Sequence, residues 1–163
     1  MEATQTTTGL SDILRLQTRL FKNVLKDIDP EKETERINGN TNHLRWLAAH
    51  IVSTRYFIGQ LAGMEIEEPH FDIIGQGKKL DETIEYPTLE ESLQDWDAIA
   101  GKVEEGLANA SDEVLSAKAP FEFPAVDNTI LGAVSFMVHH EAYHIGQMGL
   151  IRKSFGSEAM KYN

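Results

Sequence analysis

Residues 130–148 read ILGAVSFMVHHEAYHIGQM, and their pattern is that of a helix buried on most of its surface. Its apolar side chains cover well over half of the helical circumference, and the helix is expected to begin around residues 128–129 and to end at about residue 154. At about 100° per residue, His144 lies about 40° from His140, within the apolar stripe, whereas His139 points about 100° away. The helix is therefore predicted to be central, or part of a subunit interface.

Two more helices are predicted upstream, because apolar residues recur there at steps of three and four positions. The first covers residues 10–28 and is expected to end at Asp29-Pro30, since the residue before a proline is disfavoured in the α region. The second is expected to begin near Asn40 or Thr41, which are good N-cap residues, and to stop at Gly63.

Residues 64–87 show loop chemistry and form an unusually long connection for a small domain. Thr88-Leu89-Glu90-Glu91 is a capping-box candidate for the remaining helix, which extends to about Leu107 and is followed by a short helical turn over residues 111–115. No alternating strand pattern of useful length occurs. We therefore predict an all-α protein, one domain over residues 1–163, built as a four-helix bundle with a long crossover between its second and third helices.

The composition of the chain excludes several classes of function. It has 163 residues, a net charge of −11 and no cysteine, so disulfides, thiolate zinc sites, iron–sulfur clusters and a cysteine nucleophile are ruled out. The absence of a Lys/Arg cluster argues against nucleic-acid binding. Residues 1–10 lack the apolar core of a secretory signal, and no apolar run is long enough for a membrane span. We expect a cytoplasmic protein that acts on a small molecule.

A third histidine lies on the buried face of the second predicted helix. His50 falls beside Trp46, Leu47 and Phe57, so its imidazole is expected to point into the bundle. His43 is two turns upstream, roughly 10 Å along the axis, which is too far for it to share an ion with His50. We expect His43 to be packed or exposed; the alternatives are that it lines the mouth of a pocket, or that His43 or His139 replaces one of the ligands.

Three inward imidazoles need partners, because an unpaired polar group in a dry core costs on the order of 1–3 kcal/mol. His140 and His144, one turn apart, are spaced to converge on one ion, and His50 from a facing helix can complete the set. We predict one divalent metal ion (Zn, Ni, Fe or Mn) on these three ligands, with open positions for water or substrate. The alternative is a core histidine hydrogen-bonded to a carbonyl oxygen.

Two other metal motifs compete for the same helix. His140-Glu141-Ala142-Tyr143-His144 spells the H-E-x-x-H pattern of zincin proteases, in which the glutamate is the general base. The metzincin continuation needs glycine and histidine at the positions occupied by Gln147 and Leu150, so a protease is disfavoured. Glu141 and His144 also match half of a di-iron carboxylate site. The second half would have to come from Glu67-Glu68-Pro69-His70, which lies in a predicted loop, where His70 is expected at the surface.

Taken together, Trp46-Leu47-Ala48-Ala49-His50, the segment 139–147 and the long connector resemble the DinB/YfiT-like family of metal-dependent enzymes over essentially the whole chain. The resemblance implies a four-helix bundle with a long crossover and a single divalent ion held by three histidines, which map to His50, His140 and His144. It also implies a homodimer. Relatives in the family resemble transferases of low-molecular-weight thiols or hydrolases. A non-catalytic metal-binding or structural bundle is the alternative of a different class.

Three further side chains on the last helix are candidates for supporting roles. Glu141 is a candidate general base or orienting group, or alternatively the partner of an arginine or lysine. Gln147, one turn beyond His144, is a candidate hydrogen-bond partner of that ligand. Tyr143 could donate a hydrogen bond to a bound ligand, although packing is the favoured interpretation.

Overall fold

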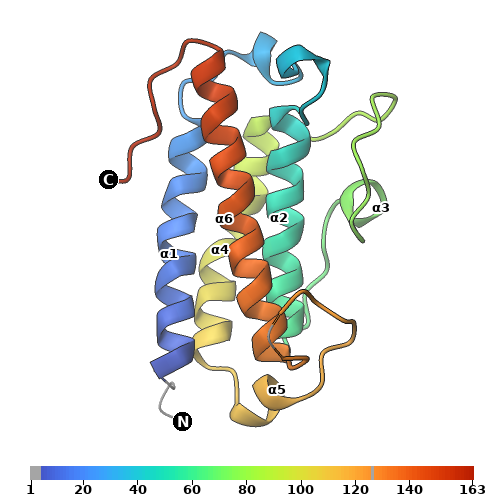
Figure 1. Ribbon diagram of the computed structural model, residues 1–163, viewed down its shortest axis with the longest axis vertical. Helices are drawn as coiled ribbons and strands as arrows, with labels where there is room; N and C mark the ends of the chain where they lie inside the picture. The colour runs from blue at the N-terminus through green and yellow to red at the C-terminus, as the bar shows by residue number, and fades with distance from the viewer. Residues whose placement is uncertain (1–4, 126) are drawn as a thin grey trace.

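Four long helices dominate the computed structural model, which describes residues 5–125 and 127–163 (Figure 1). Short helices interrupt three of the connections, and within the described residues there is no strand apart from an isolated bridge between Lys118 and Thr129. The all-α prediction is confirmed. The elements in chain order are α1 (Gln5–Leu25), η1 (Pro30–Lys32), η2 (Ile37–Gly39), α2 (Leu44–Leu61), α3 (Phe71–Ile74), α4 (Leu89–Ala108), α5 (Asp112–Ser116) and α6 (Ile130–Ser154).

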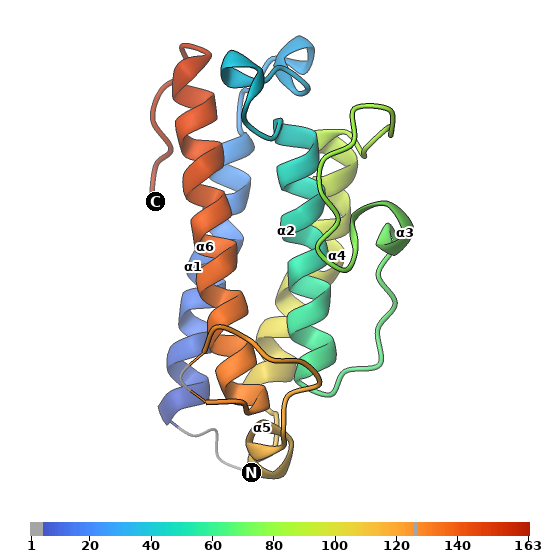
Figure 2. The ribbon, with the colours of Figure 1, turned by 45° about the vertical axis from the view of Figure 1, so that its right-hand side comes forward.

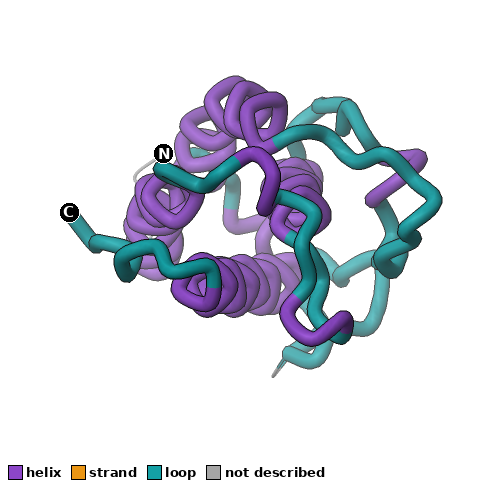
Figure 3. Tube along the Cα trace, turned by 90° about the horizontal axis from the view of Figure 1, so that it is seen from above, coloured by secondary structure: helices purple, strands orange, loops and turns teal. Residues whose placement is uncertain are grey.

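The order of the helices around the bundle differs from their order along the chain. Both α1 and α2 pack against α4 and α6, so α1 lies diagonally across from α2. α1 and α6 run in one direction, and α2 and α4 run in the other (Figures 1 and 2). Because α2 and α4 are parallel neighbours, the chain must return the whole length of the bundle between them. The predicted crossover makes this return, carries α3, and lies outside the bundle beside α2 (Figure 3).

Side-chain caps determine where α4 and α6 begin, and both starts agree with the prediction from sequence. The Thr88 hydroxyl accepts a hydrogen bond from the Glu91 amide, and the Glu91 carboxylate accepts one from the Thr88 amide, so the predicted capping box is present. Thr129 caps α6 by accepting from the amide of Gly132 at 3.1 Å. This cap sets the start of the helix that carries two of the three histidines.

Three predicted boundaries are wrong. α1 begins at Gln5, five residues before its predicted start at residue 10. α1 ends at Leu25, before the proline expected to end it, because Asp27 adopts a left-handed backbone conformation with φ of 58°. α2 begins at Leu44 and not near Asn40 or Thr41, because His43 is its N-cap: the His43 Nδ1 accepts a hydrogen bond from the Trp46 amide at 3.1 Å. A histidine nitrogen is thus the N-cap acceptor, a role that is usually filled by the side-chain oxygen of serine, threonine, aspartate or asparagine.

The bundle interior is filled by two apolar clusters that involve all four long helices. One cluster surrounds Trp96 and Phe21 on the side of the bundle where α2 and α4 begin, and the other surrounds Leu107 and Ala133 toward the opposite end. None of the helices in the described part of the chain has the length and apolar character needed to cross a bilayer.

Candidate metal centre

Three histidines meet where α2 packs against α6. The Nε2 atom of His140 lies 2.9 Å from the Nε2 of His50 and 3.1 Å from the Nε2 of His144. One ring nitrogen from each residue can be chosen so that all three lie within 4.8 Å of one another. The structure therefore brings together the three residues that the helical projection selected, from two helices that are far apart in the sequence.

Packing against aromatic rings fixes two of these imidazoles. His50 is stacked on Trp46, which lies one turn earlier on α2, with ring centroids 4.7 Å apart and an interplanar angle of 13°. Phe136 stacks on His140 in the same way from one turn earlier on α6, at 6.0 Å and 26°. His50 and His140 are partly buried, and His144 is only 7% exposed. Aromatic side chains one turn earlier on the same helices thus hold the rings of His50 and His140.

A hydrogen bond determines which nitrogen of His144 carries the proton. The His144 Nδ1–H donates to Gln147 Oε1 at 2.7 Å, and the Gln147 Nε2 in turn donates to the Tyr143 hydroxyl at 3.0 Å. The Nε2 of His144 is therefore unprotonated, and its lone pair points at the other two rings. The hydrogen bond predicted for Gln147 is present. Tyr143 packs edge-on against the His144 ring, with centroids 5.1 Å apart, although the residue is 57% exposed; a role in binding a ligand stays a prediction.

All three imidazoles are held in their neutral form. Burial lowers the pKa of His50 to about 3 and that of His140 to about 4, and the neighbouring histidines add to both effects. Burial also lowers the pKa of His144, against a smaller opposing effect of its bond to Gln147. Neutral imidazole is the form that ligates metal ions.

The proton count of the cluster favours a cation. With the proton of His144 on Nδ1, the two short contacts of His140 Nε2 cannot both be linear hydrogen bonds, because this atom offers either one proton or one lone pair. Three imidazole nitrogens around a tetrahedral zinc ion, at about 2.0–2.1 Å from it, are separated by about 3.3–3.4 Å. The observed contacts are close to this spacing, so the donor set fits a divalent ion.

A large cavity lies against this cluster. It has a volume of about 730 Å³ and lies between α2, α6, the crossover and the connection from α5 to α6. His50 and His140 line it, so a bound ion would be reached from this side. Apolar side chains predominate in the remaining wall, among them Phe57, Phe123 and Met137. A wall of this kind is typical of small-molecule sites.

Glu141 lies beside this cluster but faces away from it. Its carboxylate pairs with Arg55 of α2, with Nε–Oε2 at 3.0 Å and Nη2–Oε1 at 2.5 Å, and both side chains are fully buried. Of the two predictions for Glu141, this contact supports the arginine partner, and the catalytic role stays a prediction. The pairing also argues against a zincin protease, since the glutamate of that motif would have to face the substrate.

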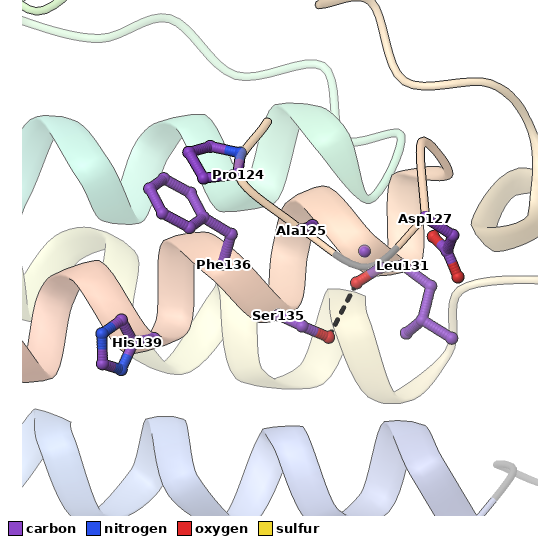
Figure 4. Close-up of a pocket in the computed structure, with 8 residues that line it drawn as sticks. Pro124, Ala125, Asp127, Leu131, Ser135, Phe136 and His139 are labelled. Carbon is purple, nitrogen blue, oxygen red and sulfur yellow. Dashed lines mark hydrogen bonds between the residues drawn. The ribbon is translucent and has the colours of Figure 1, made fainter. Parts of the chain in front are cut away.

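The remaining histidines lie elsewhere. His139 is exposed and lines a separate pocket of about 410 Å³, with Asp127 at the opposite end (Figure 4). His43 caps α2, as described above, and is buried. His70 pairs with Asp95, with Nε2 and Oδ2 3.0 Å apart, and is not part of a second carboxylate–histidine ligand set. A di-iron site therefore has no second half among the described residues.

Sequence reasoning missed two charged residues near the site. Arg55 lies among the apolar residues 51–52 and 56–58 of the second predicted helix, and an arginine buried there requires a partner; this signal was available. Glu68 lines the large cavity from the crossover, where no periodicity predicts which residue faces the bundle.

Comparison with known proteins adds one finding. A family profile described as the DinB superfamily matches residues 13–148, a segment that includes α2, α4, the crossover and all three clustered histidines. A search among curated proteins gave no match.

Proposed function

The chain belongs to the DinB superfamily, and on this basis we propose that it is a mononuclear metal-dependent enzyme whose divalent ion (Zn, Ni, Fe or Mn) is held by His50, His140 and His144. The observation that carries the proposal is the convergence of three neutral imidazoles beside a large, mainly apolar cavity, whose wall includes two of them, His50 and His140. Three protein ligands leave positions for water or substrate, which is the arrangement of catalytic and not of structural sites.

When bound, the ion supplies a Lewis acid that lowers the pKa of a coordinated water or thiol. The protein's own groups prepare the site for this. Gln147 keeps the proton of His144 on Nδ1, and the stacked rings of Trp46 and Phe136 hold the other two imidazoles in place. Apolar side chains such as Phe57 and Met137 line much of the remaining wall, where they can contact the apolar part of a substrate.

Among the reactions open to such a site, we favour transfer of a low-molecular-weight thiol. The sulfur forms a bond to an electrophilic carbon of a second small molecule, the thiol proton is released, and the leaving group departs with its bonding electron pair. Two features support this choice: the cavity, at about 730 Å³, has room for both reactants, and the chain has no cysteine that would compete for the ion or the electrophile. The proposal includes a cytoplasmic location, where thiols are kept reduced.

Metal analysis tests the site. We expect protein purified without a nickel column to hold one equivalent of divalent ion by elemental analysis, and His140→Ala to hold less than a tenth of that. His139→Ala is the matched control, because its exposed neighbouring ring lies outside the cluster, and it should retain the full equivalent. Wild-type protein that takes up no ion from micromolar zinc would favour hydrogen-bonded core histidines instead.

Turnover tests the chemistry. The metal-loaded wild type should consume a thiol together with an alkyl or aryl electrophile, chelation should abolish this activity, and added metal should restore it. Release of the hydrolysed electrophile without loss of thiol would assign a hydrolase. Metal binding without either reaction across a thiol and electrophile panel would leave a non-catalytic metal-binding bundle.

We further propose that the protein is a homodimer that associates through the outer face of α6. Leu150 and Tyr143 are two turns apart on this helix and are 66% and 57% exposed, and Gly146 between them allows close approach of a second backbone. Sedimentation should give a dimer for the wild type and a monomer for Leu150→Glu. A wild-type monomer at high micromolar concentration would contradict this assignment.

A further inference from the structure

We propose that the large cavity selects a ligand that combines an apolar, aromatic-sized body with a protonated amine, and that Glu68 is the residue that receives the ammonium group. The inference deepens the proposed function and rests on it in one respect, since the opposite end of the ligand is taken to face the three histidines. The amine site itself depends only on the cavity and on Glu68.

Glu68 is a carboxylate that lacks a full set of partners. It lies on the crossover, lines the cavity and is partly buried. Its Oε1 atom is buried and has no hydrogen-bond partner among the described residues, and no lysine or arginine of that part of the chain forms an ion pair with it. A buried acceptor without a donor is costly to the folded protein, so a ligand that brings a donor gains from meeting it.

The donor that best suits this position is charged. Burial raises the pKa of Glu68, while a hydrogen bond from Ser53 and the nearby His70 act in the opposite direction. An ammonium group offers three N–H donors and a positive charge, and hydrogen bonds between charged partners are roughly twice as strong as neutral ones. It would therefore favour the ionised carboxylate and supply the missing partner of Oε1 at once.

The same contacts indicate where the amine lies relative to the histidines. Ser53 follows His50 by three positions on α2, and both residues line the cavity. Residues three apart are neighbours on one face of a helix. Because Glu68 interacts with Ser53, its carboxylate lies about one helical turn from the His50 side of the cluster. A ligand of a dozen or so heavy atoms can span both places.

The rest of the cavity is suited to an apolar body. Phe71 of α3 and Phe121 of the α5–α6 connection line it from two separate loops, yet they are 45% and 65% exposed. Large apolar rings left in water at the wall of a cavity gain free energy when a ligand covers them. With Phe57 and Met137 on the bundle side, they can enclose an aromatic or branched aliphatic group.

Two matched probes test the amine preference. In 4-(aminomethyl)phenylmethanethiol and 4-ethylphenylmethanethiol the ring and thiol are the same, and an ammonium group replaces a methyl group of similar size. With Co²⁺-loaded wild type, titrated calorimetrically at pH 7, we expect the amine probe to bind about 10-fold tighter. The ratio should fall to near 1 in Glu68→Gln and stay at about 10 in Glu67→Gln, whose exposed neighbouring side chain is the control. Far-UV melting of both variants checks that they are folded.

The outcomes separate the two proposals. Equal affinity of the probes for wild type, or a preference unchanged in Glu68→Gln, would overturn the assignment of Glu68. If neither thiol alters the Co²⁺ absorption spectrum, coordination of thiols fails, and metal-free protein is titrated with 4-methylbenzylamine and 4-methylbenzyl alcohol by NMR. Tighter binding of the amine, lost in Glu68→Gln, would support the amine site independently of the metal. No difference between these two probes would overturn it.

Discussion

The carboxylate of Glu141, the residue next to His140, forms an ion pair with the guanidinium of Arg55 on the facing helix α2, and both side chains are fully buried. The guanidinium also lies over the ring of Trp96 at 4.2 Å. Through this one group α2, α4 and α6 are joined, and hydrogen bonds extend the network to α1 and α4 through the Thr18 hydroxyl and the carbonyl oxygens of Leu14 and Ala100.

This ion pair fixes the rotation of α6 about its axis. Successive residues on a helix point about 100° apart, so a Glu141 directed at Arg55 leaves its neighbour His140 directed at the cavity. His144, one turn later, follows the same orientation. The ion pair thus gives Glu141 a positioning role for two of the three clustered histidines, which is a different role from that of a general base.

Breaking this pair on one side should be strongly destabilising. Arg55→Met leaves a buried carboxylate without a partner, and we expect the free energy of unfolding, measured in urea, to fall by about 3–5 kcal/mol. The double variant Arg55→Met/Glu141→Leu removes both charges and should regain most of the loss. Lys22→Met, which breaks an exposed pair with Asp97, should cost less than about 1 kcal/mol. A double variant no more stable than Arg55→Met would contradict this account.

Gln147 should control metal affinity without contacting the metal. Gln147→Leu removes the acceptor that holds the proton of His144 on Nδ1, and losses of such partners typically weaken metal binding 10–100-fold. We expect this range for zinc, measured by competition with a chromophoric chelator. Tyr143→Phe removes only the exposed outer hydroxyl and should change the affinity less than threefold. Equal losses in both variants would show that the orienting bond is not the cause.

The fold could be predicted because most of its determinants are local. Helical periodicity, the Thr88 capping box and the long apolar segment 130–148 are each visible in a short window of sequence. The boundary errors arose where the chain used unusual local solutions, namely the left-handed Asp27 and the imidazole cap of His43. Asp27 and His43 are ordinary residue types, so the helical periodicity of the sequence does not reveal either feature.

The candidate site likewise has one part that is visible in local sequence and another part that depends on how the helices and the crossover pack. The pair His140 and His144 lies on one helix, and its position in the apolar stripe is visible from sequence; His50 could be added because its own stripe is equally apolar. Glu68 could not be predicted, since its place depends on how an irregular crossover folds over α2. The orientation of Glu141 toward Arg55 depends on helix packing and required the structure.

Metal-free protein should lose stability as the pH falls below about 6.5. The folded protein keeps His50 and His140 neutral to about pH 3 and 4, whereas in the unfolded chain their pKa is near 6.5. The unfolded state therefore binds more protons in this interval, so stability rises with pH and is lost on acidification. Because both rings are partly exposed, the slope should stay below about 1.4 kcal/mol per pH unit for each.

Urea unfolding of chelator-treated protein between pH 7.5 and 4.5 measures this slope. In His50→Gln the slope should be smaller than in the wild type, because one neutral imidazole has been removed from the cluster. His139→Gln, altered at an exposed ring outside the cluster, should retain the wild-type slope. If the slopes of all three proteins coincide, the cluster is not the source of the acid sensitivity.

Trp46 should be the main group that orients His50 from its own helix. The His50 Nδ1 is buried and has no hydrogen-bond partner among the described residues, so on this side of the ring the stacked indole holds the imidazole in place. Trp46→Ala should lower zinc affinity at least 10-fold and cost about 3–5 kcal/mol of stability. Leu47→Ala, the next residue on the same helix and also buried, should cost about 2–5 kcal/mol with zinc affinity nearly unchanged.

Trp46→Phe keeps an aromatic ring for the stack and removes an indole N–H that is itself buried and unpaired, so its zinc affinity should stay within threefold of the wild type. Loss of affinity in Trp46→Phe as large as in Trp46→Ala would show that stacking does not hold His50.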